Sequence, residues 1–158
     1  MSSVLGGQAS EFAISTDREN LDFELIYQLL ATETYWARER TPEIVRRSWE
    51  NSLPFVVFKQ AETCAFARVV TDYATFGWIA DVFVRREYRG RGLSKFLMQT
   101  IIAHPDLQTL RRWVLATRDA HGLYRQFGFG EMVHPQIWME RAAPNAYGNF
   151  DLKHFERD

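Results

Sequence analysis

Two glycines, each preceded by an arginine, separate an apolar run from an amphipathic segment. The stretch EYRGRGLSKFLMQTII covers residues 87–102 and places Gly90 and Gly92 one residue apart. Glycine lets another molecule approach the backbone closely, and the first N–H groups of a helix have no partner within it. The stretch therefore predicts a seat for a phosphate or pyrophosphate, with Arg89 and Arg91 adding charge. An ordinary glycine turn beside solvated arginines has the same pattern.

The spacing excludes two familiar phosphate motifs. The dinucleotide fingerprint G-x-G-x-x-G needs a third glycine where Lys95 stands, and the G-K-[ST] ending of the P-loop is absent. Any anion site here is of another kind.

A carboxylate interrupts the apolar run FGWIADVFV, residues 76–84. A buried carboxylate without a partner is costly and holds a proton readily, which would suit a general base acting on an ammonium substrate. Strand alternation predicts Asp81 on the same face as Ile79 and Phe83. A structural ion pair, for example with Arg68 on the preceding strand, explains Asp81 equally well.

The surrounding pattern predicts the elements that position these residues. Apolar spacing and capping residues favour helices over residues 21–32, 41–51, 93–104 and 120–127, with Thr41 as N-cap and Pro42 at the first helical position of the second. Runs rich in β-branched and aromatic residues predict strands near 12–16 and over 54–60, 63–73, 76–84, 111–117 and 136–141. The three central runs fit an antiparallel meander.

Length and composition limit the class of protein. The chain has 158 residues, 46% of them hydrophobic, which fits one globular domain. Its net charge of -1 gives no global argument for nucleic acid or an anionic membrane. Cys64, the single cysteine, cannot form an internal disulfide, and no Cys/His cluster has metal-ligand spacing. With no signal-peptide pattern and no apolar run of roughly 20 residues, we expect a cytoplasmic protein without a membrane span.

Two motifs resemble those of the GNAT family of N-acetyltransferases. Residues 89–94 match the acyl-coenzyme A pyrophosphate loop [QR]-x-x-G-x-[GA], except that Ser94 replaces glycine or alanine; serine is small and can cap a helix. About 30 residues later the chain resembles N-x-x-A-x-x-L-Y-x-x-x-G-F, with threonine in the asparagine position. The matching residues are Thr117, Ala120, Leu123, Tyr124, Gly128 and Phe129. The resemblance extends from about Phe12 to Met139.

The resemblance implies an α/β fold of α+β type. Its sheet would be mixed and mostly antiparallel, with a splay between the fourth and fifth strands and helices on both faces. The pantetheine arm of acetyl-coenzyme A (acetyl-CoA) would enter that splay. The implied cofactor-binding residues are Val82, Phe83, Val84, Arg89, Gly90, Arg91, Gly92, Leu93, Ser94, Thr117, Ala120, Tyr124 and Phe127.

The resemblance also implies catalytic roles. The donor carbonyl would be held by a backbone N–H around Val82 to Val84, and Tyr124 matches the tyrosine that protonates the coenzyme thiolate. Asp81 lies where some members carry an acidic residue that receives the proton of the amine. Alternatively, Tyr124 is a core aromatic residue one turn from Phe127.

The acceptor site is implied less sharply. In this fold the loop between the first two helices roofs it, which nominates Tyr35, Trp36 and Arg38. Asp72 and Tyr73, near the hairpin, are weaker candidates. Aromatic walls would grip an amine-bearing chain by packing or cation–π contact. Trp36 could equally serve only to fix the loop to the core.

We therefore expect an acetyl-CoA-dependent N-acetyltransferase that acts on a primary amine of a small molecule or peptide by direct attack in a ternary complex. A non-catalytic acyl-CoA-binding sensor module is the alternative. Neither nucleic acid nor membrane is an expected partner, and a homodimer is in keeping with the family. We expect residues 1–141 to form the single domain and residues 142–158 a C-terminal tail.

Overall fold

A mixed sheet forms the centre of the molecule. Within residues 11–144 and 146, which the computed structural model describes, five strands pair in sequence order. They are β1 (Ala13–Ser15), β2 (Leu53–Lys59), β3 (Glu62–Thr71), β4 (Phe76–Val84) and β5 (Arg112–Val114). Neighbours are antiparallel except β4 and β5, which are parallel. The implied fold class is confirmed.

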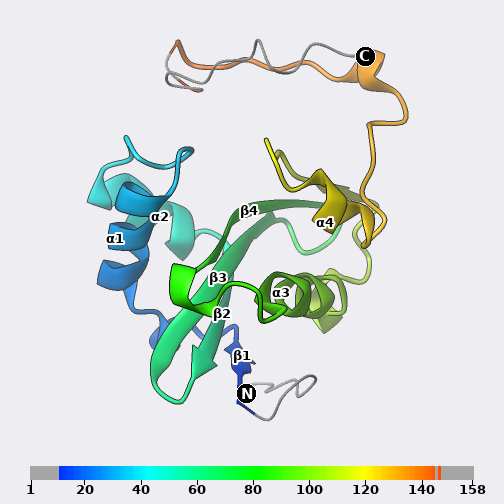
Figure 1. Cartoon of the computed structure of the whole chain (residues 1–158). Coiled ribbons are helices and arrows are strands. Elements are labelled where there is room, and N and C mark those ends of the chain that lie inside the picture. Colours follow the sequence, from blue (N-terminus) through cyan, green and yellow to red (C-terminus); the bar gives the residue numbers. More distant parts are fainter. Residues whose placement is uncertain (1–10, 145, 147–158) are drawn as a thin grey trace.

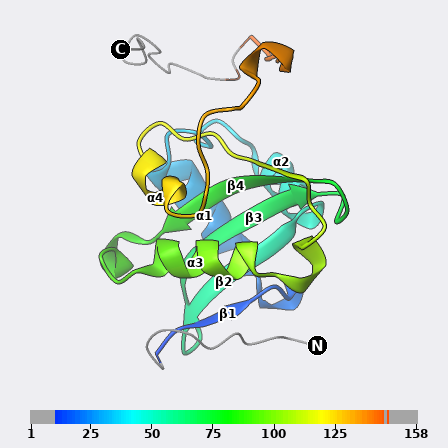
Figure 2. The ribbon, with the colours of Figure 1, turned by 90° about the vertical axis from the view of Figure 1, so that its right-hand side faces the viewer.

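Helices cover both faces of the sheet (Figure 1, Figure 2). The α-helices are α1 (Phe23–Glu33), α2 (Pro42–Glu50), α3 (Leu93–Ile102) and α4 (His121–Arg125); the 3-10 helices are η1 (Arg18–Asn20), η2 (Arg86–Tyr88), η3 (Pro105–Leu107) and η4 (Pro135–Ile137). On one face, Leu30 and Trp49 from α1 and α2 pack in a buried cluster with Phe66. On the other, Leu97 of α3 packs with Val69. The two layers bury the apolar residues of both strand faces.

The first two helices begin at side-chain caps. The Asp22 carboxylate accepts a hydrogen bond from the N–H of Leu25 at 3.1 Å, and the Thr41 hydroxyl accepts one from the N–H of Ile44 at 3.3 Å. Pro42 occupies the first position of α2, where its missing N–H costs nothing. The predicted cap at Thr41 is confirmed, and it fixes the end of the loop that leads from α1 into α2.

A β-bulge interrupts β4. Phe66 of β3 pairs with Phe83 and Arg68 pairs with Ala80, so Ala67 alone faces both Asp81 and Val82. Asp81 has a φ of 52°, in the left-handed region. The bulge reverses the alternation of side chains, because Ile79 belongs to the α3-side cluster whereas Phe83 belongs to the α1/α2-side cluster. The prediction that Ile79 and Phe83 share a face is therefore wrong.

The parallel pairing of β4 with β5 is short. It joins Phe76 to Arg112, Gly77 to Trp113 and Trp78 to Val114, and it ends there although β4 continues to Val84. Beyond Trp78, the edge of β4 therefore has no strand partner among the described residues. This is the splay between the fourth and fifth strands.

The predicted last strand, residues 136–141, is wrong. Pro135 instead begins the 3-10 helix η4, and this segment does not join the sheet. Its Trp138 ring contacts a strand residue, because the centre of the ring lies 4.6 Å from the guanidinium of Arg112. Val133 is 87% exposed and Met139 is almost fully exposed, so their apolar side chains do not add to either cluster. Of the predicted tail, residues 145 and 147–158 lie outside the described residues.

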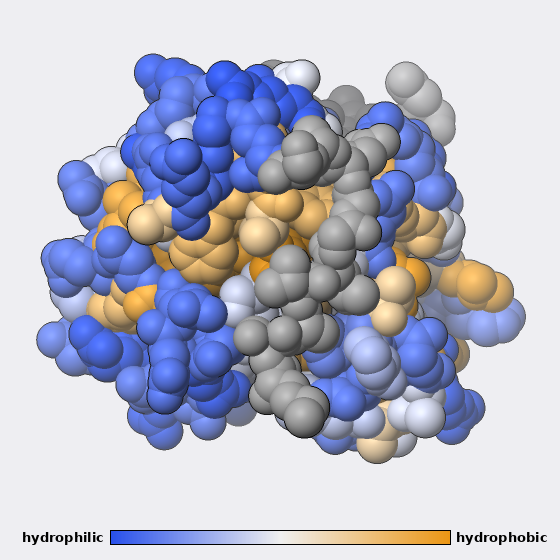
Figure 3. Space-filling view, turned by 90° about the horizontal axis from the view of Figure 1, so that it is seen from below, coloured by the Kyte–Doolittle hydropathy of each residue, from blue (hydrophilic) through white to orange (hydrophobic). Residues whose placement is uncertain are grey.

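The lower end of the molecule in Figure 1 has an apolar centre. Hydrophobic side chains gather there within a rim of hydrophilic ones (Figure 3). None of the helices within residues 11–144 and 146 combines the length and the apolar character that crossing a membrane requires.

Candidate active site

The glycine loop places free backbone N–H groups at the start of α3. Gly90 and Gly92 both have a φ of 77°, in the left-handed region that favours glycine, and Gly92 is the N-cap of α3. The first intrahelical hydrogen bond runs from the N–H of Phe96 to the carbonyl of Gly92 at 3.0 Å. The N–H groups of Leu93, Ser94 and Lys95 therefore have no intrahelical acceptor. Ser94 lies inside the first turn and does not cap it.

Space and positive charge accompany these N–H groups. A side chain at Gly90 would meet no atom within 4 Å, so the loop is open at this point. The Nε of Arg89 donates a hydrogen bond to the carbonyl of Val84 at 3.1 Å. The guanidinium of Arg91 lies 5.4 Å from the centre of the Tyr88 ring. The donor set of this loop, backbone N–H groups beside two guanidiniums, suits a pyrophosphate.

The second motif forms the short helix α4, which follows β5 in the chain. The hydroxyl of Thr117 accepts a hydrogen bond from the N–H of Ala120 at 3.0 Å, and Ala120 is the N-cap of α4. Gly128, with a φ of 86°, then reverses the chain so that the N–H of Phe129 donates to the carbonyl of Tyr124 at 3.2 Å. Threonine in the asparagine position thus keeps a polar contact that organises the turn into α4.

Tyr124 is a buried phenol within this short helix. Tyr124 as a whole is 8% exposed, and its ring packs edge-on against the ring of Phe129. Burial raises the pKa of Tyr124 to about 12, and Tyr35 and Asp119 add to the shift electrostatically. The phenol is therefore neutral at pH 7 and can act as a hydrogen-bond donor.

Residues 34–41, which we call the acceptor loop, connect α1 to α2 and approach the splay. The rings of Tyr35 and Trp36 meet edge to face at 5.0 Å. The guanidinium of Arg118, from the segment between β5 and α4, lies 3.9 Å above the ring of Tyr35. The loop is also held from inside, where the buried Thr34 hydroxyl donates to the carbonyl of Leu30 at 2.7 Å. Tyr35 and Trp36 are thus brought near the Tyr124 side of the fold, and both are exposed, as is Arg38.

Asp81 receives four hydrogen bonds from three residues. Oδ1 accepts from Trp36 Nε1 and from Arg40 Nη1, both at 3.0 Å. Oδ2 accepts from the same Arg40 nitrogen at 3.0 Å and from Arg68 Nε at 2.7 Å. The Asp81 side chain is 1% exposed. The ion pair with Arg68 that the sequence suggested as one alternative is present.

Arg40 is the member of this cluster that the sequence did not reveal. It lies 41 residues before Asp81, in the polar run ARER, where nothing in the residue types distinguishes a paired arginine from a solvated one. Trp36 fixes the loop to β4, because its indole N–H donates to Asp81, and 38% of the residue stays exposed.

Asp72 and Tyr73 lie in the hairpin between β3 and β4. The Asp72 carboxylate accepts hydrogen bonds from the hydroxyl of Thr75 and from the N–H groups of residues 74, 75 and 76, and these bonds hold the pKa of Asp72 well below its usual range. Tyr73 is exposed and has a φ of 61°. The hydrogen bonds of Asp72 serve its own turn, so the structure does not join this pair to the acceptor loop.

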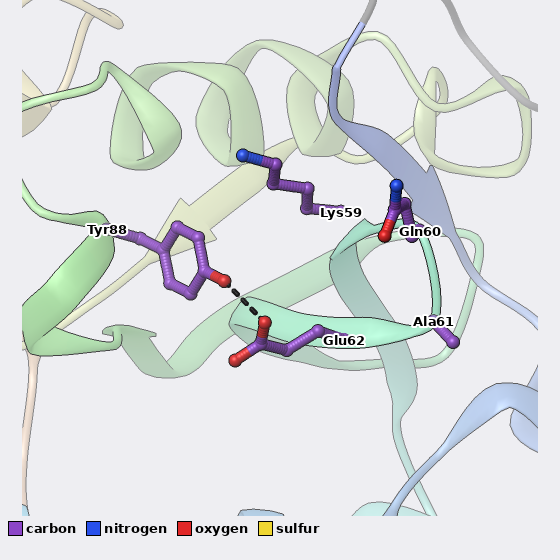
Figure 4. Close-up of a pocket in the computed structure, with 5 residues that line it drawn as sticks. All are labelled: Lys59, Gln60, Ala61, Glu62 and Tyr88. Atoms are coloured by element: carbon purple, nitrogen blue, oxygen red, sulfur yellow. Dashed lines mark hydrogen bonds between the residues drawn. The ribbon is translucent and has the colours of Figure 1, made fainter.

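An open pocket of about 460 Å³ lies at the hairpin between β2 and β3. It is lined by Lys59, Gln60, Ala61, Glu62 and Tyr88, and the Tyr88 hydroxyl donates to Glu62 at 2.7 Å (Figure 4). That hydrogen bond is the main cause of the raised pKa of Tyr88. None of the residues predicted for the site lines this pocket, although Tyr88 directly precedes Arg89 and its ring lies near the guanidinium of Arg91.

The chain belongs to the GNAT family, because the sequence model of the Acetyltransferase (GNAT) family matches residues 23–129. A crystal structure of a GNAT-family protein from Xanthomonas campestris pv. campestris is similar to it, with a TM-score of 0.83, 49% identity, and coverage of 87% of this chain and 96% of that one. Two more distant structures share the fold. Glucosamine-6-phosphate N-acetyltransferase from Arabidopsis thaliana has a TM-score of 0.56 at 19% identity, covering 82% and 97% of the two chains. A Clostridium acetobutylicum protein crystallised with acetyl-CoA has a TM-score of 0.58 at 12% identity, covering 82% and 94%.

Proposed function

We propose that the protein is an acetyl-CoA-dependent N-acetyltransferase that acetylates a primary amine of a small molecule or peptide by direct attack in a ternary complex. The observation that carries this proposal is the placement of free N–H groups at the start of α3 and of a neutral phenol, Tyr124, around the splay between β4 and β5. Bound acetyl-CoA would supply a thioester as the acetyl donor.

Residues of the glycine loop and β4 would bind and orient the donor. The N–H groups of Leu93, Ser94 and Lys95 offer a pyrophosphate the same contacts that helix N-termini offer other anions. Beyond Trp78, the backbone of β4 has lost its β5 partner, and Val82 to Val84 lie in this part of the strand. A backbone N–H on the edge of β4 that lacks β5 would support a carbonyl oxygen, which is the usual way to stabilise developing negative charge in acyl transfer. The donor set therefore fits acetyl-CoA.

Tyr124 would hold a proton at its Oη for the departing sulfur. A phenol with a pKa of about 12 keeps this proton throughout the neutral range. It lies on α4, which follows β5 in the chain, and this order would place it on the β5 side of the splay. General acids placed in this way contribute on the order of 10²–10⁴-fold to a rate.

The acceptor loop would form the wall of the amine site through Tyr35, Trp36 and Arg38. An amine nitrogen attacks only when it is neutral, and aromatic rings would pack against the adjoining carbon chain of the acceptor. The Arabidopsis thaliana protein of the same fold is named for acetylation of an amino sugar, which supports an amine acceptor. A cytoplasmic location, a single domain over residues 1–141 and a homodimer belong to the same proposal.

Thiol release from acetyl-CoA in the presence of a diverse panel of primary amines tests the proposal. We expect release that depends on at least one amine, together with an acetylated product of the matching mass. An acyl-CoA sensor would instead bind coenzyme A in a calorimeter and release no thiol with any amine. A protein that does not bind coenzyme A at all would contradict both functions.

A further inference from the structure

The acceptor loop is tied to β4 through a single carboxylate. Trp36 and Arg40 belong to the loop, Arg68 to the adjacent strand β3, and all three donate to Asp81. A carboxylate has about four lone-pair sites, and the four hydrogen bonds to Asp81 correspond to that number. The Asp81 side chain is 1% exposed, and each of its two oxygens already accepts two hydrogen bonds, so neither oxygen is available to an incoming amine.

We propose that Asp81 is a positioning residue that fixes the acceptor loop over β4, and that it is not the base that takes the proton from the amine. This proposal rests on the proposed function, because it assigns a role within the same acceptor site. A general base must come within hydrogen-bond reach of the proton that it removes. At Asp81 such an approach would first require the displacement of Arg40 or Trp36.

The charge of the cluster supports the same assignment. Two guanidinium groups face one carboxylate, which leaves a formal charge of +1 from Arg40, Arg68 and Asp81. Arg68 is largely buried, so its charge is only partly screened by solvent. A net positive cluster repels an approaching ammonium group and favours the neutral amine, which is the form that attacks. A cluster whose carboxylate takes a proton from an ammonium group would instead carry a net negative charge.

The contacts continue from Asp81 to the surface that would meet the acceptor. The indole held by Asp81 packs edge-on against Tyr35, and Tyr35 lies beneath the guanidinium of Arg118. The orientation of both aromatic side chains therefore depends on the carboxylate. Loss of the anchor should release the loop and weaken amine binding while leaving coenzyme A binding intact, since the glycine loop shares no residue with the cluster.

Trypsin cleavage after Arg38 reports the freedom of the acceptor loop without any need for acetyl transfer. In Trp36→Phe, which keeps an aromatic ring but loses the indole N–H, we expect cleavage after Arg38 to become about tenfold faster, because local opening exposes the loop. Asp81→Asn should show a larger increase. Trp78→Phe and Arg47→Met, which change an exposed tryptophan of β4 and an exposed arginine of α2, are the matched controls and should cleave like the wild type.

Steady-state kinetics with the best amine of the panel separate an anchor from a base. Trp36→Phe, Arg40→Met and Asp81→Asn should all raise KM for the amine by about three- to thirtyfold and change kcat by less than about threefold. Arg40→Lys, which keeps the charge without the planar donor group, should restore part of the loss.

Two results would overturn the proposal. One is an unchanged rate of cleavage after Arg38 in folded Trp36→Phe and Asp81→Asn. The other is a loss of kcat confined to Asp81→Asn, with Trp36→Phe and Arg40→Met unaffected, since that pattern identifies a base. If Asp81→Asn does not fold, the Trp36→Phe and Arg40→Met variants decide the question. A negative amine panel would contradict the proposed function and leave the proteolysis result readable.

Discussion

Replacing Tyr124 by phenylalanine removes one hydroxyl and leaves the ring. The ring packs against Phe129, and no hydrogen bond of the Tyr124 hydroxyl is found among the described residues, so the variant should fold with nearly unchanged stability. Its affinity for coenzyme A should also stay close to that of the wild type. Any loss of turnover would then report on the hydroxyl itself.

The raised pKa of Tyr124 limits how much turnover the hydroxyl can contribute. Complete transfer of its proton, from a pKa of about 12, to a thiolate with a pKa near that of cysteine, about 8.5, crosses roughly 3.5 pKa units, or about 5 kcal/mol uphill. The phenol should therefore stabilise the developing thiolate mainly through a hydrogen bond. We expect Tyr124→Phe to lower kcat by about ten- to a hundredfold, equivalent to about 1.4–2.7 kcal/mol, which is at or below the lower limit of what general acids usually contribute.

Steady-state rates with the best amine, measured between pH 6 and 10, test this expectation. Because the phenol titrates only near pH 12, ionisation of Tyr124 should cause no fall in the wild-type rate within that range. Tyr27→Phe, a change to a half-buried tyrosine of α1, is the matched control and should keep its turnover. A Tyr124→Phe enzyme with wild-type kcat would refute the catalytic role and leave Tyr124 as a packing residue.

Other substitutions test the loop, the sheet and the hairpin. Gly92→Val should lower the affinity for coenzyme A at least about tenfold in calorimetry, because a β-branched residue is strained at a φ of 77° and crowds the N–H groups of α3. The control Arg125→Lys should keep the affinity. A folded Gly92→Val protein with normal affinity would exclude the glycine loop as the pyrophosphate site. Gly77→Ala should lower the free energy of unfolding by about 1–3 kcal/mol in thermal melts, because the new methyl group would lie 2.8 Å from Cδ1 of Leu110. An unchanged melting temperature would show instead that the Leu110 side chain moves aside. The lowered pKa of Asp72 means that its turn stabilises the fold above about pH 4 and loses that effect as the carboxylate is protonated. The difference in melting temperature between wild type and Asp72→Ala should therefore shrink as the pH falls from 5 to 2, and a constant difference would contradict this account.

The sequence motifs located much of the site because they depend on local backbone chemistry. Gly90 and Gly92 adopt the left-handed conformation that their residue type favours, and Thr41 caps α2 as its position before Pro42 predicts. These features are set by residues close together in the chain. The family resemblance added the order of the strands, which no local pattern specifies.

The errors came from long-range pairing. Alternation along residues 76–84 assumes a regular ladder, and the bulge at Asp81 breaks that assumption; aspartate tolerates a positive φ better than most residues, which was the one local hint. The pairing of Arg40 with Asp81 depends on the path of a loop far away in sequence. Residues 136–141 have a strand-like composition but find no partner strand among the described residues, and Pro135 turns the chain into a 3-10 helix instead.

The bulge in β4 also places the Asp81 side chain outside the regular ladder of the sheet. Over the segment where β3 has one residue, Ala67, β4 has two, Asp81 and Val82, so β4 contains one residue more than a regular ladder requires. Omitting Asp81 would restore strict alternation and leave Ile79 and Phe83 in the clusters that they now occupy. Asp81 is thus a supernumerary residue of the ladder, but a chain without it would lose the carboxylate that pairs with the largely buried Arg68 and holds Trp36 of the acceptor loop. The extra residue therefore gives β4 a position whose side chain can hold the acceptor loop without displacing an apolar residue from either layer.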